Sequence, residues 1–192
     1  MYTIRKYAPG DKELLRAVCM ETAGEVFHRS ERLLKAVPVI YNDYFTECEP
    51  ENVFVAADED GRAVGYVICA ADRKLFLRRM LFHYIPTAAR MHPFMLLCGL
   101  AGVAAVLRNG KNAFTHMHID LTAAYQHKGA GSALINTLRD HLAAKGIDTL
   151  HINSITRDAD AYPFYMKYGF TESKKLIAGY YALGIPTARD KQ

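Results

Sequence analysis

Residues 119–132 constrain the fold more than any other part of the chain, because they place a glycine-rich loop between an expected strand and an expected helix. The residue pattern predicts a strand over residues 113–121 and a helix over about 129–144, with Gly146 as its C-terminal stop. A second strand is predicted over 149–155. A strand, helix, strand crossover of this kind joins parallel neighbours, so the sheet should contain a parallel pair.

The loop has the form Gln126-x-x-Gly129-x-Gly131, and its glycines fall on the first helical turn, where backbone N–H groups have no intrahelical partner. Because glycine has no Cβ atom, a phosphate can approach these amides closely. The helix dipole and the charge of Lys128 favour an anion there, so the loop is interpreted as a pyrophosphate-binding site. The spacing differs from that of a P-loop and from the dinucleotide fingerprint. The alternative is a plain turn whose glycines allow close packing.

The rest of the chain reads as one domain over residues 1–192, with no linker or repeat. The predicted order is strand, two helices, a β-hairpin, a helical insertion over 72–111, and then the crossover, a short helix and two strands. Pro38 is expected to divide the second helical stretch, and the insertion is expected to form two or three short helices laid over the sheet. The remaining predicted strands cover residues 2–7, 53–57, 63–70, 170–176 and 179–183. The remaining predicted helices are one that begins after Asp11 and ends at about residue 26, one over 30–48 and one around 159–168.

Composition limits the class of protein and its surroundings. The formal charge is +4 and is spread along the chain, so no nucleic-acid partner is predicted. The four cysteines form no CxxC pair, which favours reduced thiols and a cytoplasmic location. The longest apolar stretch, 94–107, is shorter than the roughly 20 residues of a membrane span, so no stable membrane insertion is predicted.

A second motif lies about thirty residues after the loop, in Ala-Tyr-Pro-Phe-Tyr-Met-Lys-Tyr-Gly-Phe at 161–170. Together with Gln126, Gly129 and Gly131 it resembles the GCN5-related N-acetyltransferase (GNAT) superfamily. The likeness covers residues 113–176 well, and the N-terminal helices and the hairpin fit the family's order of elements. The resemblance implies an α/β (α+β) fold: a mixed, mostly antiparallel central sheet with helices on both faces. Its fourth and fifth strands would form a parallel pair that splays to hold CoA, and the insertion at 72–111 has no family counterpart.

The resemblance implies acetyl-CoA as the donor and no metal. The pantetheine arm would bond the backbone of Ile119 and Leu121, and an N–H of the splayed strand, that of Leu121, is the expected donor to the oxyanion. Tyr165 matches the family tyrosine near the sulfur and is the expected acid for the thiolate, with a packed core aromatic as the alternative. The other expected cofactor-binding residues are Gln126, His127, Lys128, Gly129, Ala130, Gly131, Ser132 and Asp158.

The sequence departs from the family pattern in two places. Asp158 stands where many relatives have an asparagine that contacts the CoA arm, and an aspartate cannot donate the amide hydrogen bond. The glutamate that serves some relatives as a base has no match, since Thr115 and Asn153 are nearest its place.

Alternate residues of the expected strand supply other bases, namely His116, His118 and Asp120, and Asp120 is preferred. Two histidines and an aspartate can also ligate zinc, but no further ligand cluster supports a metal. The third reading of these residues is a set of polar groups lining a cleft.

The sequence therefore predicts an acetyl-CoA-dependent N-acetyltransferase that acts on a primary amine of a small molecule or peptide. The alternative is a catalytically weak or inactive acyl-CoA-binding module of the same fold. The insertion would lie beside the acceptor as a lid or specificity element. Family members often dimerise, so the resemblance also allows a homodimer.

Overall fold

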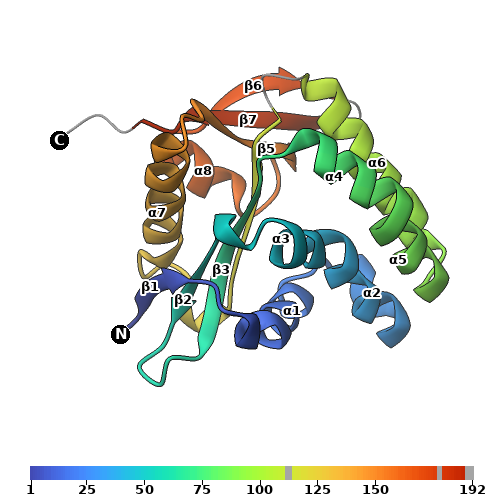
Figure 1. Ribbon diagram of the computed structural model, residues 1–192, viewed down its shortest axis with the longest axis horizontal. Helices are drawn as coiled ribbons and strands as arrows, with labels where there is room; N and C mark the ends of the chain where they lie inside the picture. The colour runs from blue at the N-terminus through green and yellow to red at the C-terminus, as the bar shows by residue number, and fades with distance from the viewer. Residues whose placement is uncertain (111–113, 177–178, 189–192) are drawn as a thin grey trace.

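The computed structural model describes residues 1–110, 114–176 and 179–188. Within these residues the centre is a seven-stranded sheet with the strand order β1-β2-β3-β4-β5-β7-β6 (Figure 1). Only β4 and β5 run parallel; every other neighbouring pair is antiparallel. The predicted fold class is therefore confirmed. The strands are β1 (Thr3–Lys6), β2 (Val53–Ala57), β3 (Ala63–Ala70), β4 (His116–Leu121), β5 (Thr149–Thr156), β6 (Thr171–Lys175) and β7 (Tyr180–Pro186).

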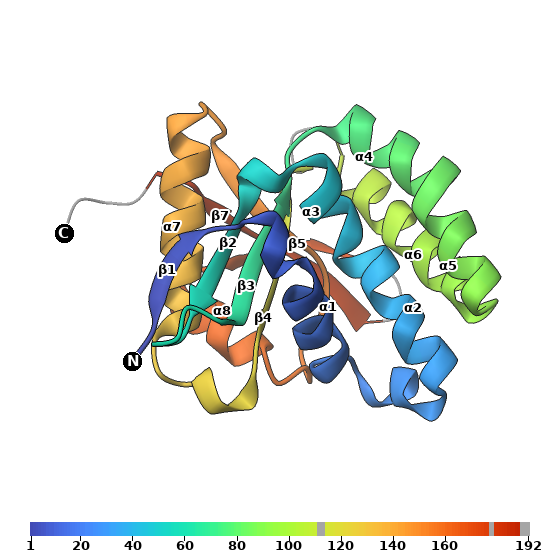
Figure 2. The same ribbon diagram turned by 60° about the horizontal axis from the view of Figure 1, so that its bottom comes forward.

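Helices cover both faces of the sheet, and each face has its own core. On one face lie α1 (Lys12–Glu21), α2 (Glu31–Tyr41) and α3 (Asp43–Cys48), packed on side chains such as Tyr66 and Ile68. On the other face α7 (Ala130–Ala144) and α8 (Tyr162–Tyr168) pack on Val67, Cys69 and Met117 (Figure 2). All residues of β2 and β3 are buried, as expected for central strands that are covered on both sides.

The insertion differs from its prediction. Its first part is α4 (Arg73–Arg79), a π-helical turn (Met80–Tyr84) and α5 (Ile85–Met91), which follow one another without a break in the helical backbone. It continues as α6 (Phe94–Asn109), which has 16 residues and is not short. These helices pack mainly on α2 and on one another, and α6 also contacts β5, so they do not simply cover the sheet. Residues 111–113, where the insertion was expected to end and the next strand to begin, lie outside the described residues.

The prediction that Pro38 divides the second helical stretch is wrong. Pro38 lies inside α2, which continues to Tyr41, and the break comes at Asn42. Pro38 lacks the N–H that would reach back along the helix, but its carbonyl still accepts from the Asn42 N–H at 2.9 Å. The buried positions around it, Val37, Val39 and Ile40, hold this part of α2 in the core. Tertiary packing thus overrides the local penalty of the proline.

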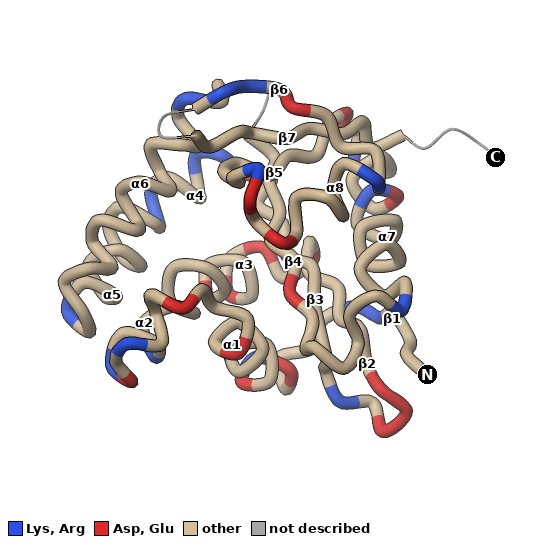
Figure 3. Tube along the Cα trace, turned by 180° about the vertical axis from the view of Figure 1, so that it is seen from behind, with Lys and Arg blue, Asp and Glu red and all other residues tan. Residues whose placement is uncertain are grey.

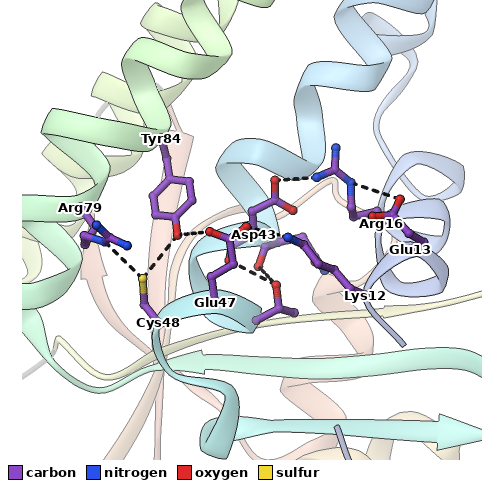
Figure 4. A network of polar contacts seen from close by, with 10 residues as sticks. Lys12, Glu13, Arg16, Asp43, Glu47, Cys48, Arg79 and Tyr84 are labelled. Atoms are coloured by element: carbon purple, nitrogen blue, oxygen red, sulfur yellow. Dashed lines mark hydrogen bonds and ion pairs between the residues drawn. The ribbon is translucent and has the colours of Figure 1, made fainter. Parts of the chain in front are cut away.

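A network of polar contacts fastens the start of the insertion to α1 and α3 (Figure 4). Glu47 accepts from Lys12 at 2.7 Å and from the Tyr84 hydroxyl at 2.8 Å. Tyr84 also lies 3.3 Å from the Cys48 sulfur. Nearby, the buried Glu49 carboxylate accepts from the backbone N–H groups of residues 71 and 72, where the chain leaves β3. The insertion is therefore held in a defined place.

No helix in the described residues combines the length and the apolar character needed to cross a bilayer.

The two glycines of α6 give a test of how the insertion packs. A Cβ atom at Gly99 would lie 2.5 Å from Ile85 Cγ1 on α5, whereas one at Gly102 would meet nothing within 4 Å. We expect Gly99→Ala to lower the free energy of unfolding by about 1–3 kcal/mol, because it overpacks the α5–α6 contact. Gly102→Ala, the matched control, should leave stability unchanged or raise it by up to about 1 kcal/mol. Urea denaturation measures both, and equal behaviour of the two variants would contradict this packing.

Candidate functional site

The site begins where β4 and β5 separate. Their parallel ladder records one pair, His116 with His151, and the His151 N–H donates to the Thr115 carbonyl at 2.9 Å. On its other side β4 pairs with β3 along its whole length. The Thr122 N–H donates to the Val64 carbonyl, so the main-chain groups of Thr122 point toward β3. Main-chain groups alternate in direction along a strand, and those of Ile119 and Leu121 therefore point away from β3, toward β5. Beyond the single pair, the ladder provides these groups with no partner on β5.

The predicted anion site stands at the end of this opening. The N-cap of α7 is Gly129, at φ +84°, and no side chain caps the helix. His127 has φ +57°, so two residues with left-handed backbone shape the turn. A Cβ atom at Gly131 would lie 3.2 Å from Phe164 Cζ and 3.4 Å from Leu121 Cδ1. A side chain at position 131 would require Phe164 to move by a few tenths of an ångström, and among the described residues no side chain accepts from the first-turn N–H groups of α7.

The other loop residues have differing surroundings. Gln126 is exposed, and its side-chain Nε2 donates to the Leu121 carbonyl at 2.9 Å, which ties the loop to the end of β4. Lys128 is exposed, with its Nζ 5.7 Å from the centre of the Tyr125 ring. Ala130 is buried, Ser132 is partly buried and His127 is exposed.

Asp158 lies apart from the loop, in the exposed turn after β5. Hydrogen bonds from the Thr156 side chain and from its own backbone lower the pKa of its carboxyl group. These contacts shape the turn, and no described hydrogen bond joins Asp158 to residues 126–132. A role for it in CoA binding stays a prediction.

Tyr165 is near enough to Asp120 to be affected by its charge. Tyr165 is only 8% exposed and its ring packs against Phe164 and Phe170, with centroids at 5.3 and 5.5 Å. Burial and, second, the charge of Asp120 raise the pKa of its hydroxyl, so the phenol stays protonated at neutral pH. The packing agrees with the core aromatic of the sequence reading, and the acid role of Tyr165 stays a prediction.

Asp120 is held by groups that the sequence did not reveal. The Tyr66 hydroxyl on β3 donates to its Oδ2, and the Thr22 side chain, whose hydroxyl donates to the Val18 carbonyl at 2.9 Å, lies near it. Burial raises the pKa of Asp120, and the polar groups of Tyr66 and Thr22 offset part of that rise. Tyr66 lies directly opposite Asp120 in the β3–β4 register. The period-2 pattern of two strands predicts which residues share a face, but the register between strands comes only from the folded sheet.

The two histidines of β4, His116 and His118, differ in their surroundings. His116 is 2% exposed, packs against the rings of Phe45, Phe76 and Phe114, and its Nδ1 bonds the Phe114 carbonyl at 2.9 Å. Burial and the neighbouring His118 lower its pKa to about 3. His118 is partly exposed, and burial lowers its pKa to about 4. Both imidazoles are therefore neutral at pH 7.

Among the described residues no group of three or more His, Cys, Asp or Glu side chains is arranged to hold a metal ion. The expectation that the protein works without a metal stays a prediction.

Comparison with known proteins adds independent findings. A family profile described as the acetyltransferase (GNAT) family matches residues 20–170. The crystal structure of a protein named SsHAT is 26% identical, with a TM-score of 0.80 over 98% of this chain and 99% of that chain. No curated protein sequence matches the chain.

Two further solved structures are less similar in sequence and show the fold alone. A GCN5-related N-acetyltransferase from Kribbella flavida is 14% identical, with a TM-score of 0.58 over 96% of this chain and 97% of that one. The ribosomal-protein-S18-alanine N-acetyltransferase from Escherichia coli is 16% identical, with a TM-score of 0.54 over 100% of this chain and 97% of that one.

Removing the Tyr66 hydroxyl tests the surroundings of Asp120. Tyr66→Phe takes away a hydrogen bond that favours the ionised carboxylate, so we expect the pKa of Asp120 to rise further. A carbon-13 NMR titration of labelled aspartate carboxyl groups measures it. The control Tyr162→Phe also removes a tyrosine-to-carboxylate hydrogen bond, the one to Glu172 at 2.5 Å, and should leave Asp120 unchanged. An unaltered or lower pKa of Asp120 in Tyr66→Phe would contradict the assigned contact.

Proposed function

The chain belongs to the GNAT acetyltransferase family, and from this premise we propose that it transfers an acetyl group from acetyl-CoA to a primary amine. The observation that carries the proposal is the opening between β4 and β5, which has main-chain donors along one edge, an uncapped helix N-terminus at one end, and Asp120 and Tyr165 beside it. Each of these parts serves one step of acyl transfer.

The residues of the opening fit a pantetheine arm and a pyrophosphate. The backbone of Ile119 and Leu121 would hold the amide groups of the arm as an added strand does. The amides of Ala130, Gly131 and Ser132, with Lys128 beside them, would hold the pyrophosphate, and His127 and Gly129 supply the backbone turn that exposes these amides. Gln126 contributes by fixing the loop to Leu121. When bound, acetyl-CoA supplies an acetyl group activated as a thioester.

The chain's own groups handle the protons. The ionised Asp120 accepts a proton from the ammonium form of the acceptor, and its raised pKa brings its basicity closer to that of the amine. The Leu121 N–H stabilises the oxygen that becomes negatively charged when the amine nitrogen bonds to the acetyl carbon. Tyr165 gives its proton to the sulfur as the carbon–sulfur bond breaks, and the second proton lost by the nitrogen restores the phenol through solvent. The products are an N-acetyl amide and the free thiol.

The alternative is a module that binds acyl-CoA without turnover. Thiol release from acetyl-CoA with a panel of primary amines separates the two functions, once CoA binding has been measured by a thermal shift. Release with at least one amine supports the enzyme, and binding without release across the panel supports the module. A cytoplasmic location, a homodimer and the absence of a nucleic-acid partner stay predictions.

The pyrophosphate assignment predicts the effect of a charge reversal. Lys128→Glu should weaken acetyl-CoA binding by roughly tenfold or more, because a charge-assisted contact with a phosphate is replaced by repulsion. Isothermal titration calorimetry measures the Kd. Lys74→Glu, on the exposed side of α4, changes the net charge equally and should leave the Kd unaltered. Equal Kd values for Lys128→Glu and the unmodified protein would remove Lys128 from the site.

The acid role of Tyr165 predicts a kinetic separation. Tyr165→Phe keeps the ring that packs on Phe164 and Phe170, so we expect kcat to fall on the order of a hundredfold while the KM for acetyl-CoA changes little. Tyr168→Phe, one turn along the same helix, removes a hydroxyl that bonds Asn136 at 2.5 Å and should leave kcat unchanged. Steady-state kinetics gives both values, and a normal kcat in Tyr165→Phe would exclude the acid role.

A further inference from the structure

Among the described residues Asp120 has no cationic partner, and in this it differs from Asp11 and Asp43. The buried Glu49 also lacks a cation, but its two oxygens accept four hydrogen bonds, from the Tyr44 hydroxyl, the Asn52 side chain and the N–H groups of residues 71 and 72. Asp11 is bonded by both terminal nitrogens of Arg5 at 2.7 Å, and Asp43 is bonded by Arg16 at 2.8 Å. Asp120 accepts from an uncharged donor, the Tyr66 hydroxyl, and lies near the Thr22 side chain, whose hydroxyl donates to the Val18 carbonyl at 2.9 Å. A largely buried carboxylate without a countercharge is costly, so this side chain is suited to receive a cation from outside the chain.

The approach to Asp120 comes from the face opposite α7. The glycine loop starts α7, and Leu121 packs in the core of that face, so the pantetheine arm would lie on the α7 side of the opening. His118 and Asp120 alternate with Ile119 and Leu121 and therefore point to the face covered by α1 and α2. An amine that attacks a thioester held in the opening must come from this second face, because the arm fills the first.

Aromatic rings line that face in an unbroken row that we call the aromatic wall, formed by Phe94, Phe27, Tyr41 and His118. Successive centroids are 6.3 Å apart for Phe94 and Phe27, 6.2 Å for Phe27 and Tyr41, and 6.0 Å for Tyr41 and His118. All four side chains keep some exposure to solvent. The row runs from the start of α6 to β4, where Asp120 is two residues beyond His118. The insertion therefore supplies one end of the wall.

The wall carries little charge of its own. Burial lowers the pKa of His118 to about 4, so the imidazole is neutral. The ionisable groups that raise the pKa of Tyr41 are Cys98, which accepts a hydrogen bond from its hydroxyl, Cys19 and Tyr180, and no carboxylate is among them. Figure 3 shows acidic positions on α1 and α3 and none on α6. Asp120 is thus an anionic group at the β4 end of the wall, and Glu25 lies two residues before Phe27 in the 3-10 helix (Glu25–Arg29) that carries this ring.

From this arrangement we propose that the acceptor is a primary monoamine whose ammonium group is joined by a short spacer to an aromatic ring. The inference rests on the proposed acetyl transfer and narrows its substrate. The ammonium group would lie at Asp120, and the ring would pack on the rings of His118, Tyr41 and Phe27. A polyamine would instead place further ammonium groups against the rings of His118 and Tyr41, away from the carboxylate of Asp120, at a cost in lost hydration. A basic peptide would meet the same obstacle.

A panel of amines tests the proposal. Thiol release from acetyl-CoA is measured with 2-phenylethylamine, n-butylamine, spermidine and a basic peptide with a free N-terminus. We expect 2-phenylethylamine to give the highest kcat/KM, at least tenfold above n-butylamine and spermidine. A higher kcat/KM with spermidine or the peptide would overturn the aromatic acceptor while leaving acetyl transfer intact. No release with any amine would overturn the proposed function and this inference with it.

A pair of variants links the preference to the wall. Phe27→Ala should raise the KM for 2-phenylethylamine roughly tenfold and leave the KM for n-butylamine and the Kd for acetyl-CoA unchanged. Phe82→Ala, which removes an 81% exposed ring from the π-helical turn, should alter none of these values. An equal rise in both amine KM values, with acetyl-CoA binding and the melting temperature preserved, would show that the wall does not select the ring.

Discussion

The single parallel pair between β4 and β5 is the constraint on which the rest of the site depends. A continuous ladder would satisfy the inward main-chain groups of Ile119 and Leu121 with β5, and the sheet would be closed. Because the strands part after His116 and His151, β4 has a finished edge toward β3 and an unfinished one toward β5. Backbone groups near a protein interior require partners, so an extended ligand with amide groups would complete the sheet. The proposed cofactor site is in this sense a missing stretch of strand.

In the proposed reaction the pleat of β4 separates the two substrates. Ile119 and Leu121 belong to the face under α7, whereas His118 and Asp120 belong to the face under α1 and α2. Acyl transfer needs a donor arm and an acceptor that meet at one atom without competing for the same space. A strand whose alternate residues serve opposite faces meets this need with local geometry alone. Tyr165, reaching the opening from α8, places a proton near the point where the two faces meet.

Local signals predicted the parts of this arrangement that depend on local physics. The glycine loop follows from residues 126–131, since Gly129 takes a positive φ and a Cβ atom at Gly131 would lie 3.2 Å from Phe164 Cζ. The hairpin and the crossover follow from strand and helix periodicity. Contacts between distant segments were beyond such signals: Tyr66 bonds Asp120 through the register of β3 and β4. The course of α2 through Pro38, and the π-helical join of α4 to α5, also depend on tertiary packing that no short pattern specifies.

The charge of Asp120 is not balanced by a cation of the described chain, in contrast to the charges of Asp11 and Asp43. Asp11 and Asp43 are fixed by arginines that come from β1 and α1, so their negative charge is already used in holding the fold. An arginine placed at Asp120 would satisfy it equally well, but it would then occupy the space through which an amine must pass. The Tyr66 hydroxyl holds the carboxylate, and an uncharged donor lowers its pKa less than a guanidinium would. Burial raises the basicity of the carboxylate, and in the proposed reaction the acceptor supplies its countercharge.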